Sequence, residues 1–154
     1  MRLANKKHMH QAKTHEKIFC LINILLPLLM GAYIYIKINK NSHFGNWICS
    51  LFSISKIEYS EGIWSALRNW GGDFLWAYAL FFALYLTLNG MNNARKYSFI
   101  LSMICSIFME LTQLFQIGPL KGGTFDIIDI VVEVLGICIG MKFLHIKKEN
   151  RSNE

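Results

Sequence analysis

Four long apolar segments dominate the chain of 154 residues. A helix that crosses the hydrocarbon core of a bilayer needs about 20 consecutive, mostly apolar residues, and each segment is close to that length. Hydrophobic residues make up 53% of the chain and charged residues only 17%, whereas soluble domains carry about 25% charged residues. We therefore predict an all-α, polytopic membrane protein, a bundle of about four transmembrane helices. The expected spans are Ile18 to Ile36, Gly72 to Asn89, Tyr97 to Ile117 and Phe125 to Ile146.

The basic residues are distributed unevenly between the two sides of such a bundle. Ten Lys and Arg residues fall in the two terminal segments and the second connection, whereas five fall in the first and third connections. Because basic loops stay in the cytoplasm, both termini of this cell-membrane protein are predicted to be cytoplasmic. The net charge of +6 then reflects topology, so a nucleic-acid partner is not needed to explain it. The predicted organisation is a basic tail (1–17), a transmembrane domain (18–146) and a second basic tail (147–154).

The first connection, residues 37–71, is expected on the outer side of the membrane. The stretch 47–57 mixes apolar and small polar residues, which suits either an interfacial or re-entrant segment or an irregular loop that rests on the headgroups. Cys49 would be the only cysteine on this side, so no disulfide framework is indicated. All four tryptophans fall in this connection or in the first outer turn of the next span, as expected for an interfacial aromatic belt: Trp47, Trp64, Trp70 and Trp76.

The fourth apolar segment carries acidic residues that a membrane helix must hide from lipid. Asp126, Asp129 and Glu133 follow one another at i, i+3 and i+7, and they share a helix face with Gly136 and Gly140. Each such charge costs roughly 2.5 to 3.5 kcal/mol at the centre of an inserted helix. The face should therefore meet protein, water or a bound ion rather than lipid.

Polar residues of the neighbouring spans fall at the same depth. Asp73 lies at the outer start of the second span, and Glu110 and Gln113 lie near the outer end of the third. The short connection between the third and fourth spans, which contains Lys121, makes these two spans antiparallel neighbours. Buried acids with few basic partners must be protonated, share protons or hold a cation. The predicted ligand-binding residues are Glu110, Gln113, Asp126, Asp129, Asp73 and Lys121, and the candidate catalytic residues are Glu110, Asp126, Asp129 and Glu133.

Several of these residues also have a purely structural explanation. Asp73 or Asp126 could be the N-cap of its helix, and Gln113 alone could form an interhelical hydrogen bond. Gly136 and Gly140 match the small-xxx-small pattern that lets membrane helices approach closely, so we expect them to serve helix packing.

The segments around these acids resemble the signature of VanZ-like membrane proteins. In that family E-x-x-Q is followed, after a connection that contains glycine, by a D-x-x-D helix that closes on G-x-x-x-G. The resemblance covers the chain from Asn69 to Gly140, and two positions depart from it. Many members have Arg where this chain has Gly123, and Asn where it has Glu133. The matching positions are Glu110, Gln113, Asp126, Asp129, Gly136 and Gly140.

The resemblance implies a protein of the cell envelope, because the family is named for a protein associated with low-level resistance to the glycopeptide teicoplanin. We expect a link to such resistance or to the handling of lipid-linked cell-wall precursors. We expect a non-catalytic protein rather than an enzyme. The expected partners are the bilayer and a lipid-linked glycan precursor or glycopeptide-related ligand, and a homo-oligomer is compatible with the sequence.

Two alternatives from other classes remain open. Clustered carboxylates could hold a divalent cation that bridges a lipid phosphate, which would make the protein an enzyme with Arg68 or Lys121 as charge partner. Intramembrane acids also suit a small proton- or ion-coupled carrier. The catalytic motifs H-E-x-x-H, G-x-S-x-G and G-x-x-x-x-G-K-[ST] do not occur in the chain.

Overall fold

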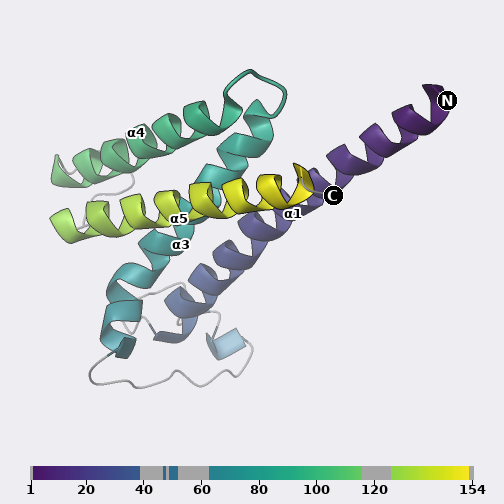
Figure 1. The fold of residues 1–154 in the computed structure, drawn as a ribbon. Helices are drawn as coiled ribbons and strands as arrows, with labels where there is room; N and C mark the ends of the chain where they lie inside the picture. Colours follow the sequence, from purple (N-terminus) through teal and green to yellow (C-terminus); the bar gives the residue numbers. More distant parts are fainter. Residues whose placement is uncertain (1, 39–46, 48, 52–62, 116–125, 153–154) are drawn as a thin grey trace.

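The computed structural model describes residues 2–38, 47, 49–51, 63–115 and 126–152. Four long helices make up nearly all of this described part, which contains no strand, so the all-α prediction is confirmed. The helices, labelled in Figure 1, are α1 (Arg2–Ile38), α3 (Ile63–Leu88), α4 (Ala94–Leu114) and α5 (Ile127–Ser152).

Three helices of the described part are long and apolar enough to cross a membrane. Their candidate spans are Thr14–Ile36, Asn69–Leu88 and Ala94–Leu114, which correspond to the first three predicted spans. The chain is therefore a multi-pass membrane protein. α5 has 26 residues and so has the length to span, but it is not among these candidate spans. That α5 is a fourth span stays a prediction.

The helices extend beyond the apolar segments at several ends. α1 begins at Arg2 and α5 continues to Ser152, so both basic tails prolong the adjoining helix. α3 begins at Ile63, so it extends over the last nine residues, 63–71, of the predicted first connection. Hydropathy marks where a helix leaves the hydrocarbon, whereas the backbone hydrogen bonds of the helix can continue beyond that point. Asp73 consequently lies inside α3, and the N-cap explanation for it is wrong.

Little of the first connection belongs to the described part. Trp47 and residues 49–51 are helical, and the remainder of the predicted interfacial segment 47–57 lies outside the described residues. Cys49 is only 8% exposed, and its Sγ lies 3.7 Å from the carbonyl oxygen of Ile36 near the end of α1.

α3 is the central helix of the bundle, because it packs against α1, α4 and α5. α4 also packs against α5, and the two run side by side in Figure 1. The turn from α3 into α4 contains two residues with positive φ, Gly90 at 120° and Asn93 at 64°. Glycine and asparagine tolerate this conformation best, so the chain can reverse here within a few residues. We call the opposite end of α4, where α4 ends and α5 begins, the outer end of the bundle, following the predicted topology.

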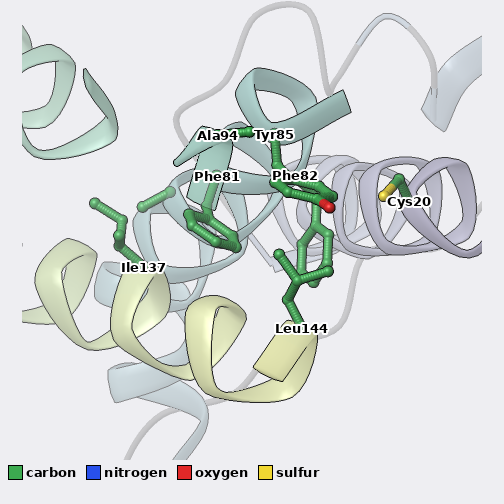
Figure 2. Close-up of a cluster of buried hydrophobic side chains, with 8 residues drawn as sticks. Cys20, Phe81, Phe82, Tyr85, Ala94, Ile137 and Leu144 are labelled. Carbon is green, nitrogen blue, oxygen red and sulfur yellow. The ribbon is translucent and has the colours of Figure 1, made fainter. Parts of the chain in front are cut away.

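The buried apolar core joins the four described helices near the other end (Figure 2). Phe19 of α1 stacks on Phe143 of α5 and meets the edge of Phe82 of α3, with both pairs of ring centroids 5.8 Å apart. The buried members of the cluster are Cys20, Ala77, Phe81, Phe82, Tyr85, Ala94, Ile137 and Leu144.

Two hydrogen bonds between side chains tie α1 to α3 within these apolar surroundings. The Tyr78 hydroxyl donates to Asn23 Oδ1, and the Tyr85 hydroxyl donates to Glu16 Oε1, both at 2.5 Å. Such bonds hold membrane helices together where apolar contact alone gives no preference for protein over lipid.

Candidate functional site

The buried face of α4 consists of every fourth residue along the helix: Ala94, Ser98, Ser102, Ser106 and Glu110. Residues four apart lie above one another on a helix, and small side chains let neighbouring helices come close. The Ser98 and Ser102 hydroxyls each donate to the carbonyl oxygen four residues earlier, at 2.7 Å. The face therefore delivers one carboxyl, that of Glu110, into the outer half of the bundle. The i, i+4 recurrence of serine was the signal that would have identified the whole face from sequence.

Four carboxyl groups from three helices meet there. Asp73 comes from α3, Glu110 from α4, and Asp129 and Glu133 from α5, and these carboxyls lie within electrostatic reach of one another. Glu110 and Glu133 are each only 3% exposed, whereas Asp73 and Asp129 are half-buried. We call these four residues the acidic cluster. It brings together residues that are far apart in the sequence.

The hydrogen bonds of the cluster are incomplete. Gln113 Nε2 donates to Glu110 Oε1 at 3.2 Å, so Gln113 orients the Glu110 carboxyl from the next turn of α4. Three buried oxygen atoms have no hydrogen-bond partner among the described residues: Glu110 Oε2, Glu133 Oε2 and Ser106 Oγ. The Ser106 hydroxyl lies near the Glu133 carboxyl, but the two do not meet the geometry of a hydrogen bond. Each buried polar atom left in this state costs about 1 to 3 kcal/mol.

No described Lys, Arg or His forms an ion pair with the acidic cluster. Lys121 lies outside the described residues, and the Arg68 side chain does too. The cluster thus holds like charges in a largely apolar setting, an arrangement that favours bound protons or a cationic or hydrogen-bond-donating ligand. Within the described part of the chain, no three His, Cys, Asp or Glu side chains are placed to hold a metal ion.

Asp126 lies within electrostatic reach of Glu110 and Asp129, and it has a second role at the start of α5. Its Oδ1 accepts a hydrogen bond from the backbone N–H of Ile128 at 2.9 Å, and its carbonyl oxygen accepts one from the N–H of Asp129 at 3.1 Å. This is the geometry of an N-cap, which satisfies backbone donors that the first turn of a helix leaves free. Asp126 therefore starts α5 at the rim of the cluster.

The two glycines of α5 lie against α3. A Cβ atom at Gly136 would come within 2.6 Å of the Phe74 carbonyl oxygen and 3.3 Å of the Tyr78 nitrogen, both backbone atoms. At Gly140 a Cβ atom would lie 3.0 Å from Cδ1 of Phe81. The glycine face is thus occupied within the chain, so a homo-oligomer would have to use another surface. Close approach at Gly136 brings Asp73 and Glu133 to the same level.

An apolar cavity of about 810 Å³ lies between α1, α3 and α5. Its lining includes Tyr33 of α1, Trp70 and Phe74 of α3, and Leu135 of α5. These residues belong mainly to the candidate spans, so the cavity lies at membrane depth. Sequence patterns did not predict it, because it depends on how far α1 diverges from α5.

Comparison with known proteins adds the family. A search of curated proteins and a search of solved structures found no match. A family model described as VanZ/LLP1 matches residues 2–148, a range that includes α1 as well as the whole acidic cluster. The resemblance seen between Asn69 and Gly140 therefore extends over nearly the whole chain, and this membrane protein belongs to the VanZ/LLP1 family.

Proposed function

We propose that this VanZ/LLP1 protein handles lipid-linked cell-wall precursors at the outer side of the cell membrane and thereby alters susceptibility to teicoplanin-type glycopeptides. The observation that carries the proposal is the acidic cluster. Four carboxyls in an apolar bundle, without a basic partner among the described residues, cost folding energy that apolar residues would not. A chain selected for stability alone has no use for them, so we infer that they serve a ligand.

The chemistry of the cluster defines the class of ligand. Carboxyl groups accept hydrogen bonds and attract positive charge, and the peptide part of a cell-wall precursor offers amide N–H groups and amines. The predicted topology puts the cluster in the outer half of the membrane, where such a headgroup would be met. The apolar cavity of about 810 Å³ is in the size range of ligand pockets, roughly 300 to 1,000 Å³, and would suit a hydrocarbon chain.

The test is complementation of a deletion strain with variants of matched chemistry. Glu110→Gln and Asp129→Asn remove a charge and keep the shape of the side chain. Glu149→Gln is the control, because Glu149 is exposed at the opposite end of α5. Glycopeptide susceptibility, the pool of lipid-linked precursors and the amount of protein in the membrane are measured in each strain.

We expect Glu110→Gln and Asp129→Asn to lose the effect on susceptibility while they accumulate at least as well as wild type. Removing a carboxylate relieves an insertion cost, so accumulation should not fall. Glu149→Gln should behave as wild type. If both cluster variants keep full activity, or lose activity only in proportion to lost protein, the proposal is wrong. Altered susceptibility with unchanged precursor pools favours a non-catalytic role, whereas accumulated precursors favour an enzyme that acts on lipid phosphates.

A further inference from the structure

We propose that Glu110 and Glu133 share one proton inside the bundle and that the Ser106 hydroxyl competes with this proton for the Glu133 carboxylate. The inference deepens the proposed function and rests on it for its purpose. A ligand that brings positive charge to the acidic cluster would displace the proton, so proton release and ligand binding would be linked.

The two glutamates lie at nearly the same depth on antiparallel helices. Glu110 is four residues, or about 6 Å, from the last residue of α4, and Glu133 is six residues, or about 9 Å, from the first residue of α5. Both side chains are 3% exposed. Ser106 lies one turn deeper on α4, is 1% exposed and is near Glu133. The three residues therefore occupy a common buried space between α4 and α5.

A count of donors and acceptors shows what is missing. Glu110 Oε2, Glu133 Oε2 and Ser106 Oγ all lack a partner among the described residues. An ionised carboxylate has no hydrogen to donate, and a serine hydroxyl has one. With both glutamates ionised, a single hydroxyl hydrogen would face two negatively charged groups. One added proton supplies a second donor and removes one of the charges.

The charged groups that surround the pair favour this proton. α3 contributes Asp73 and α5 contributes Asp129, and both carboxyls lie within electrostatic reach of Glu110 and Glu133. On α4, Gln113 is neutral and already donates to Glu110 Oε1. α5 also contributes Asp126, which lies within electrostatic reach of Glu110. These charged groups are all acids, and like charges stabilise the protonated form of a carboxyl group.

The chemical step requires no partner other than water. On release, the O–H bond of one carboxylic acid breaks, its electron pair stays on the carboxylate and the proton passes to water at the outer end. Rebinding reverses the step. Since linkage is reciprocal, a cationic ligand that expels the proton would in turn bind more weakly when protons are abundant.

Infrared spectroscopy of the full chain in lipid vesicles tests the site directly. The carbonyl stretch of a protonated carboxyl is followed during a pH titration of wild type, Glu110→Gln, Glu133→Gln and Ser106→Ala, with Glu149→Gln as control. We expect wild type and the control to show a protonated carboxyl at neutral pH. In either glutamine variant of the pair, the remaining carboxyl should bind its proton at least about tenfold more weakly, because the like-charged partner is gone.

Ser106→Ala provides a test with the opposite sign. It keeps both carboxyls and removes the competing hydroxyl donor, so the shared proton should be bound more tightly than in wild type. Absence of a protonated carboxyl in wild type at neutral pH would overturn the inference, as would unchanged proton binding in Glu133→Gln. The readout involves neither antibiotic nor precursor lipid, so its failure is distinguishable from failure of the proposed function.

Discussion

The close contact between α5 and α3 predicts a large effect for a very small substitution, Gly136→Ala. The added methyl group would lie 2.6 Å from the carbonyl oxygen of Phe74 and 3.3 Å from the nitrogen of Tyr78. Backbone atoms in a packed helix cannot rotate away, so α5 must shift. Overpacking of this kind costs about 3 kcal/mol, and alanine returns about 1 kcal/mol of helix propensity. The net loss in unfolding free energy should be about 2 kcal/mol.

Gly72→Ala is the matched control. Gly72 also lies in a long helix, but nothing is within 4 Å of the position of its Cβ atom, so the same substitution should stabilise by about 1 kcal/mol. The two variants should thus differ by about 3 kcal/mol, which is about 100-fold in the ratio of folded to unfolded protein. Gly140→Ala should fall between them, because the ring of Phe81 can turn aside. The measurement is reversible unfolding in mixed detergent micelles. Equal stability of Gly136→Ala and Gly72→Ala would refute the contact.

Three further predictions concern single contacts and topology. Tyr78→Phe removes the hydrogen bond to Asn23 and should lower the unfolding free energy by about 1 kcal/mol. A double-mutant cycle with Asn23→Ala should show coupling between the two residues, and additive losses would contradict the hydrogen bond. Asp126→Ala removes the N-cap of α5 and should cost about 1 kcal/mol in the same assay, whereas Asp126→Asn, which keeps the acceptor, should not. In a cysteine-free background, an impermeant thiol reagent on intact cells should label Leu51→Cys but not Met91→Cys, both at exposed positions; the reverse pattern would invert the topology.

Local properties of the sequence were sufficient for the general architecture. The length of an apolar segment sets whether it can span the bilayer, so α1, α3 and α4 were found without knowledge of their neighbours. Helical periodicity likewise placed Gln113 one turn from Glu110, where it donates its hydrogen bond. The family signature depends on the same local spacing of residues, and the match over residues 2–148 agrees with it.

Other features were decided only by packing between helices. Periodicity put Gly136 and the acids on one side of α5, but it did not say that α3 would touch the glycines while α4 would face the carboxyls. Asp73 and Asp126 both precede apolar runs in the sequence. Asp73 nevertheless lies inside α3 and joins the cluster, whereas Asp126 caps the start of α5. A helix period determines which residues share a face, whereas the neighbour that covers this face is set by contacts between residues distant in the chain. The acidic cluster, built from three helices, is therefore a product of the tertiary structure.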